Sequence, residues 1–166
     1  TGVIPPALLD EIRPAMYRCQ GHITKHVGTE RLIRARELGV LRLMLKVEPV
    51  FYRLLELPEL LSIIDATVSS TAVLHLQNGF ILPSYPPGGV PSVFQNRYHR
   101  DFPRYLNGYL ASVNALFAID RFTRENGATF VVPGSHQRPD SPSDAAVNAI
   151  GFPVECEAGS MLVFDS

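Results

Sequence analysis

Apolar positions in the first third of the chain recur at helical spacing. One stripe consists of Leu8, Leu9, Ile12, Met16, Cys19 and Ile23. This spacing places the stripe on one face of a helix that buries a single side. Pro14 falls inside the stripe and lacks the N–H that a helix uses, so we predict a kink or a junction of two helices there. Pro49 and Pro58 each suit the first position of a further helix.

The pattern changes near residue 71, where short runs favour strands. We predict strands at 71–76, 80–82, 93–101, 109–119, 129–132 and 159–164. Residues 83–91 are rich in proline and glycine and predict a loop, and the polar stretch 137–148 predicts another. Helices followed by a run of strands indicate an α+β protein whose β part is a barrel or a sandwich.

Composition narrows the class of protein. The 166 residues suit one domain, and a hydrophobic fraction of 46% with 19% charged residues is typical of a globular chain. A net charge of −1 gives no general attraction to nucleic acid or to a membrane surface, and no apolar run is long enough for a bilayer span. The cysteines Cys19 and Cys156 favour two separate thiols in a reducing cytoplasm. The chain starts without Met and stops after an apolar run, so we expect a longer polypeptide.

The triplet His99-Arg100-Asp101 has the spacing of a metal-ligand pair. In an extended segment alternate side chains face the same way, so His99 and Asp101 can meet one ion while Arg100 points elsewhere. One imidazole and one carboxylate are two of the three ligands in the facial triad that binds non-haem Fe(II). Taken alone, such a triplet is more often a surface strand pair or a turn, but together with the block Asn126–His136 it predicts an iron site.

Several segments carry a resemblance to a known family. They are residues 98–101, the block Asn126–His136, the strand-like 159–164 and the stretch 50–70. On these motifs the chain resembles the phytanoyl-CoA dioxygenase family of Fe(II)- and 2-oxoglutarate-dependent oxygenases. The resemblance implies a double-stranded β-helix, a jelly-roll barrel flanked by helices. It also implies one oxygenase domain over 1–166, with helices in 1–68 and a jelly-roll core in 71–166 that is truncated at the C-terminus.

The resemblance also implies an activity. Iron held by His99, Asp101 and a second histidine would take 2-oxoglutarate at two positions and O2 at the third, and a small organic substrate would be oxidised. In related halogenases a small residue replaces the carboxylate, so Asp101 favours hydroxylation. The second histidine and an arginine that anchors 2-oxoglutarate are expected beyond Ser166. His136 is interpreted as a turn residue of the Pro-Gly-Ser-His segment and not as an iron ligand.

Further candidate site residues are inferred from their positions relative to the family's motifs and to the candidate iron ligands. Thr129 matches a family position whose hydroxyl can reach 2-oxoglutarate, and Gln95 or Asn96 matches a polar position before the first iron histidine. Which of these two faces inward depends on the strand register. Arg100 and Arg104 lie next to the ligands and are candidates for contact with the substrate, because a guanidinium pairs with an anionic group.

Two alternatives stay open from the sequence. A jelly-roll binding or regulatory protein could keep the scaffold without turnover, and a metal-dependent cupin-type enzyme could use no oxoacid. The discriminating features are a second histidine and an anchoring arginine downstream. The sequence selects neither the substrate nor the oligomeric state.

Overall fold

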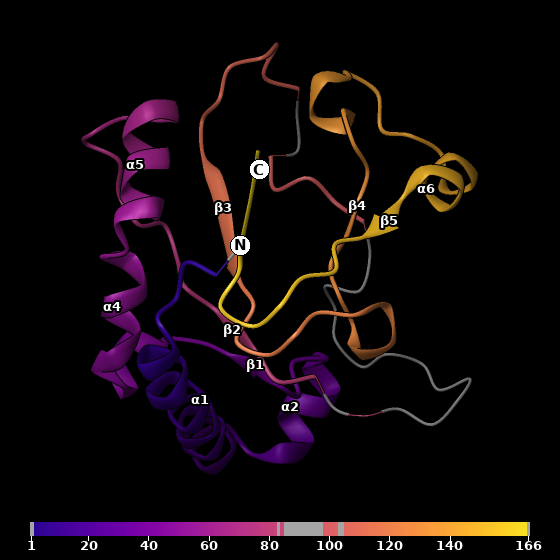
Figure 1. The fold of residues 1–166 in the computed structure, drawn as a ribbon. Coiled ribbons are helices and arrows are strands. Elements are labelled where there is room, and N and C mark those ends of the chain that lie inside the picture. The colour runs from indigo at the N-terminus through magenta and orange to yellow at the C-terminus, as the bar shows by residue number, and fades with distance from the viewer. Residues whose placement is uncertain (1, 83, 85–97, 103–104, 166) are drawn as a thin grey trace. The chain divides into compact units, whose positions relative to one another are not determined.

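The structure is a computed structural model that describes residues 2–82, 84, 98–102 and 105–165. The chain divides into two compact units, each built from separate stretches. One unit comprises Pro6–Glu56 and Val73–Arg97, and the other comprises Thr1–Pro5, Leu57–Ala72 and Tyr98–Ser166. Helices lie in the N-terminal part and short antiparallel strands follow, so the α+β prediction is confirmed at this level (Figure 1).

The unit that contains Pro6–Glu56 is mainly helical. Its elements are α1 (Pro6–Val27), α2 (Thr29–Ala35), β1 (Val40–Leu41), α3 (Met44–Val47), η1 (Pro49–Phe51), α4 (Tyr52–Leu55) and β2 (Gly79–Phe80). Helix α1 is one helix and not two, although it contains Pro14. Pro14 and Asp10 are both exposed, so the carbonyl that loses its helical partner faces water.

The apolar stripe of α1 forms the centre of this unit. Its residues Ile12 and Cys19 are fully buried, together with Leu41 of β1 and Phe51 of η1. Two ion pairs lie at the surface of this unit. Arg18 Nε is 2.7 Å from Glu48 Oε1, and Arg53 Nη1 is 2.7 Å from Glu11 Oε1 of α1. The predicted helical stripe therefore supplies core residues of this unit, and the ion pairs lie at exposed positions around it.

The other unit contains the strands that matter for the site. Its elements are α5 (Pro58–Thr67), β3 (Val113–Phe117), η2 (Arg124–Asn126), β4 (Phe130–Val131), η3 (Ser135–Gln137), α6 (Asp144–Ile150), β5 (Phe152–Pro153) and β6 (Met161–Asp165). The strands β3 and β6 are antiparallel, with Val113 opposite Asp165 and Phe117 opposite Met161. They run side by side in Figure 1, the first in orange and the second in yellow.

The described strands pair only two by two, as β1 with β2, β3 with β6 and β4 with β5. Within the described residues they do not close into a jelly-roll barrel, so the expected double-stranded β-helix is not seen there. The strand predicted at 71–76 is absent, and its Val73 is 87% exposed, because this apolar run finds no strand partner. Residues 98–101 also lie outside any strand ladder, and the predicted residues 93–97 lie outside the described part.

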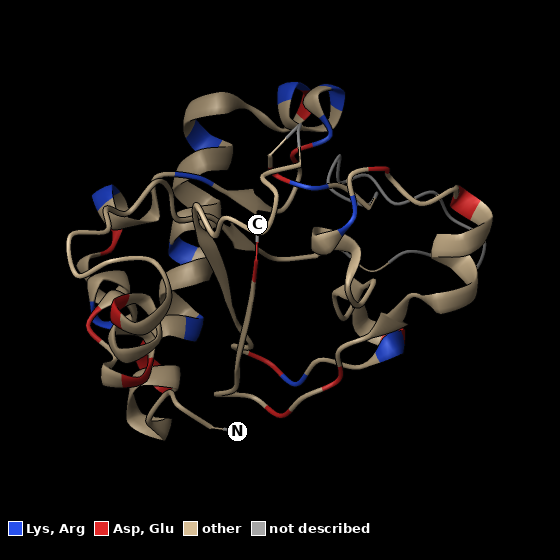
Figure 2. Cartoon of the chain, turned by 90° about the horizontal axis from the view of Figure 1, so that it is seen from above, with Lys and Arg blue, Asp and Glu red and all other residues tan. Residues whose placement is uncertain are grey.

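Basic and acidic residues both occur along the helices and loops (Figure 2), in keeping with the net charge of −1. Residues 66–82 and 105–119 carry no Asp, Glu, Lys or Arg. Within the described residues, no helix combines the length and the apolar composition that a bilayer span requires.

Candidate iron site

The structure brings the two predicted metal ligands together. His99 Nε2 lies 3.5 Å from Asp101 Oδ1, and the two side chains are 53% and 47% exposed. Both residues belong to the unit that contains β3 and β6. The two donor atoms therefore face each other at a surface that solvent and small ligands can reach.

The donor atoms fit a shared divalent ion. Nitrogen and oxygen ligands about 2.1 Å from an ion and at right angles lie about 3.0 Å apart. The observed separation of 3.5 Å is close to this, so a small side-chain rotation brings both atoms into range. Among the described residues, no group of three or more His, Cys, Asp and Glu side chains could hold a metal. The pair would supply two of the three ligands that the sequence analysis expects.

Asp101 is held by a residue that the sequence analysis did not single out. Asn114, in β3, donates from Nδ2 to Asp101 Oδ2 at 2.7 Å. Its neighbours in the strand, Val113 and Ala115, are apolar. An asparagine within a short apolar strand is unfavourable for strand formation, and this was the signal that could have identified it.

Arg100 points away from the pair, as the alternation predicts. Its guanidinium donates to the carbonyl of Arg138 at 2.8 Å and to the hydroxyl of Ser141 at 3.0 Å. Both acceptors belong to the polar stretch after η3. Arg100 therefore anchors this stretch to the segment that carries the candidate ligands.

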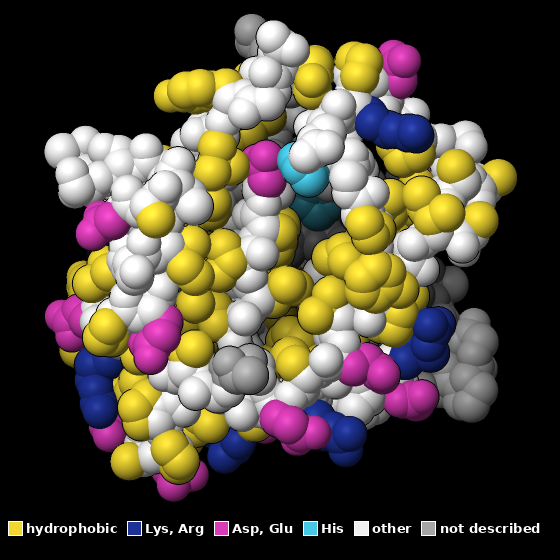
Figure 3. Space-filling model, turned by 45° about the horizontal axis from the view of Figure 1, so that its top comes forward, with side chains coloured by type: hydrophobic (Ala, Val, Ile, Leu, Met, Phe, Trp, Pro, Cys, Tyr) yellow, Lys and Arg dark blue, Asp and Glu magenta, His cyan; other side chains and the backbone are white. Residues whose placement is uncertain are grey.

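Two cavities adjoin this region. A small one, of about 20 Å³, includes Arg100, Tyr105 and His136 in its wall. A larger one, of about 390 Å³, is lined by Ile63, Thr67, Gly108, Leu110, Val113, His136, Gln137, Val163, Phe164 and Asp165. It lies at the same end of the β3–β6 pair as Asn114, and its wall is mainly apolar. Figure 3 shows histidine and acidic side chains beside a hollow on the face of the molecule.

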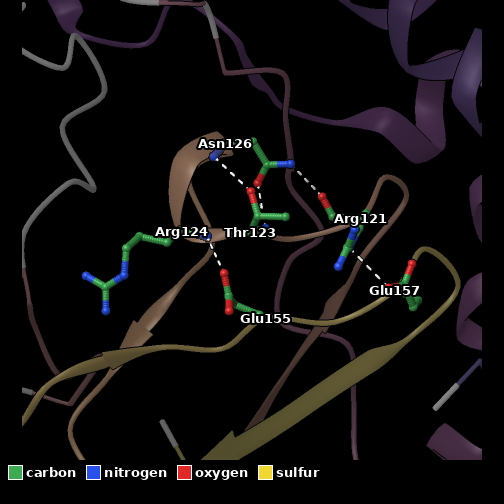
Figure 4. Close-up of polar contacts among 6 residues, drawn as sticks. All are labelled: Arg121, Thr123, Arg124, Asn126, Glu155 and Glu157. Carbon is green, nitrogen blue, oxygen red and sulfur yellow. Dashed lines mark hydrogen bonds and ion pairs between the residues drawn. The ribbon is translucent and has the colours of Figure 1, made fainter. Parts of the chain in front are cut away.

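The predicted block Asn126–His136 is organised by hydrogen bonds near its start (Figure 4). The Asn126 side chain accepts from Thr123 N at 2.8 Å and donates to the Arg121 carbonyl at 2.6 Å, while Thr123 Oγ1 accepts from Asn126 N. Gly127 follows with a φ of 95°, which an L side chain rarely adopts. This capping box turns the chain into β4.

The remaining predicted site residues take different places. Thr129 is half-buried just before β4, a strand that pairs with β5 and not with the β3 strand of Asn114, and the Thr129 carbonyl accepts from Val154 N at 2.8 Å. His136 lies in η3, exposed, and lines both cavities. Gln95, Asn96 and Arg104 lie outside the described residues.

The chain matches a protein family along its whole length. Residues 1–166 match the family described as phytanoyl-CoA dioxygenase (PhyH), and the chain belongs to this family. The resemblance inferred from its motifs is therefore confirmed.

Curated proteins of two kinds are similar to the chain. The chain is 58% identical over 164 residues to an uncharacterized protein of Mycobacterium tuberculosis and to one of Mycobacterium bovis, which covers 99% of this chain and 60% of each relative. It thus spans about 60% of the length of these curated relatives. A 55-residue stretch is 47% identical to the dioxygenase aneA of Aspergillus aculeatus, over 32% of this chain and 18% of that protein. No solved structure matches the chain.

Proposed function

We propose that the protein is an Fe(II)- and 2-oxoglutarate-dependent dioxygenase that hydroxylates a small organic molecule. The observation that carries the proposal is the juxtaposition of His99 Nε2 and Asp101 Oδ1, 3.5 Å apart and half-exposed, in a chain of the phytanoyl-CoA dioxygenase family. A carboxylate and an imidazole with open positions beside them suit non-haem iron. When bound, iron and 2-oxoglutarate supply the oxidising chemistry with O2.

The protein's own residues are proposed to bind the ion and to orient 2-oxoglutarate and the substrate. His99 and Asp101 hold the ion, Thr129 and one of Gln95 and Asn96 are proposed to contact 2-oxoglutarate, and Arg104 is proposed to contact the substrate. Arg100 is likewise proposed to contact the substrate, because it lies in the wall of the small cavity, and its guanidinium also donates to the Arg138 carbonyl and the Ser141 hydroxyl. The described strands are proposed to belong to a double-stranded β-helix, which the family implies. The antiparallel pairing of β3 and β6, far apart in sequence, supports this arrangement.

The larger cavity supports a small molecule as the substrate. Its volume of about 390 Å³ lies in the range of pockets that take metabolite-sized ligands. Apolar side chains dominate the wall, and His136, Gln137 and Asp165 provide polar groups that can orient a ligand. An apolar wall of this kind favours binding of the apolar part of a small molecule.

The test is an anaerobic titration of the full-length protein with Fe(II) and 2-oxoglutarate. The expected result is a visible metal-to-ligand charge-transfer band that saturates, and that Asp101→Ala weakens or shifts. A matched control is Asp144→Ala, because Asp144 is an exposed carboxylate at the start of α6. A folded protein without the band would contradict the proposal and favour a binding protein on the same scaffold.

A further inference from the structure

The two oxygens of the Asp101 carboxylate have different partners. Oδ2 accepts a hydrogen bond of 2.7 Å from the Asn114 amide, whereas Oδ1 lies 3.5 Å from His99 Nε2. The carboxylate is about half-exposed, and without a partner it would rotate freely. The hydrogen bond therefore selects one orientation, in which a single oxygen faces the imidazole.

We propose that Asn114 is a positioning residue that fixes the Asp101 carboxylate for metal binding through Oδ1. The inference rests on the proposed function and deepens it. Residues that hydrogen-bond to a metal ligand orient it and strengthen the site, and their removal weakens metal binding about 10–100-fold.

The place of Asn114 in the fold suits this role. It lies in β3, and its backbone is opposite Phe164 of β6, so the strand pair holds the amide in place. The side chain is short and loses little conformational freedom on binding the carboxylate. The amide is also neutral, so it donates a hydrogen bond without offsetting the negative charge that attracts a cation.

The local sequence gives no competing reason for an asparagine here. The other residues of β3 are Val113, Ala115, Leu116 and Phe117. Asparagine is disfavoured in strands, and an apolar residue would continue the pattern. The contact with Asp101, which lies 13 residues earlier in the chain, is the interaction that accounts for it.

The test is a double-mutant cycle on metal affinity in the full-length protein. Mn²⁺ serves as the probe, and free Mn²⁺ is counted by its electron paramagnetic resonance signal. Asn114→Leu keeps the approximate shape of the side chain and removes the donor. We expect Mn²⁺ to bind about 10–100-fold more weakly to this variant. In an Asp101→Ala background the same substitution is expected to cause no further loss, since Asn114 acts through Asp101.

Controls separate positioning from folding. Asn114→Val is a second variant without the donor, and valine favours strands, so it serves if the leucine variant does not fold. Thermal unfolding without metal checks that each variant is folded. Asn148→Leu, at an exposed position of α6, is the matched control and is expected to bind Mn²⁺ like the wild type.

The outcomes distinguish the two hypotheses. Wild-type affinity in folded Asn114→Leu or Asn114→Val would overturn the positioning role while leaving the proposed function intact. An equal loss in the presence and absence of Asp101 would also overturn it, because Asn114 would then act independently. A wild type that binds no Mn²⁺, or that binds it equally well after Asp101→Ala, would overturn the proposed function and this inference with it.

Discussion

The guanidinium of Arg100 donates to the hydroxyl of Ser141 at 3.0 Å, across 41 positions of the chain. A second hydrogen bond joins the other terminal nitrogen of the guanidinium to the Arg138 carbonyl at 2.8 Å. The residue between the two candidate iron ligands thus holds the polar stretch that follows η3. This contact gives the middle residue of the triplet a structural role.

Replacing Arg100 with lysine is expected to loosen this stretch. Lysine has one nitrogen and cannot reach both acceptors as the planar guanidinium does. Loss of one hydrogen bond of ordinary strength would raise the hydrogen-exchange rate of the Arg138 amide, which donates to the Ser135 carbonyl, about tenfold. Hydrogen exchange with mass spectrometry measures this, and Arg53→Lys, which changes an exposed ion pair of α1, is the control. Unchanged exchange combined with a higher KM for the substrate would instead assign Arg100 to substrate binding.

Asn126 is expected to stabilise the turn before β4. Asn126→Ala removes the side-chain hydrogen bonds to Thr123 N and to the Arg121 carbonyl. Loss of a cap of this kind lowers the free energy of unfolding by about 1–2 kcal/mol. Urea denaturation measures the change, and Asn148→Ala, exposed on α6, is expected to have an effect near zero. Equal free energies of unfolding for both variants would mean that the capping box contributes nothing measurable.

Phe51 is expected to be a main contributor to the helical unit. Its side chain is 1% exposed, whereas that of the next residue, Tyr52, is 51% exposed. Phe51→Ala creates a cavity and is expected to lower the free energy of unfolding by about 3–5 kcal/mol. Tyr52→Ala removes a ring of similar size from the surface and should cost far less. Thermal or urea unfolding of the two variants compares them directly, and similar losses would show that Phe51 is not a core residue in solution.

Cys19 is expected to be unreactive in the folded protein. Burial raises the pKa of its thiol to about 11, so the reactive thiolate is scarce at pH 8. In a Cys156→Ser variant, a disulfide-exchange reagent should modify Cys19 far more slowly than in the urea-unfolded chain. Because the folded pKa lies above the unfolded one, this thiol also lowers stability as the pH rises from about 9 towards 11. Fast modification without urea would contradict both expectations.

The helices were the most predictable part of the fold. Pro58 opens α5 as expected, since proline suits a first helical position. Strands were less predictable, because a strand needs a partner that local pattern does not reveal. Residues 71–76 have a strand-like composition but find no partner, whereas 113–117 and 161–165 find each other.

Only those contacts of the site that join residues close together in the sequence were predictable. His99 and Asp101 are two positions apart, so their juxtaposition follows from local geometry even though no strand ladder forms there. Asn114 and the acceptors of Arg100 lie 13 to 41 positions away from their partners. Such contacts depend on the tertiary fold, and the local pattern of residues does not predict which distant segments come together.

The pairing of β3 with β6 has a consequence for the order of events during synthesis. Residues 113–117 leave the ribosome well before 161–165, and a strand cannot pair with one that has not yet been made. The helical contacts of α1 are local and form early. The orientation that we propose Asn114 gives to Asp101 would therefore form late, once the strand opposite Asn114 has also been made.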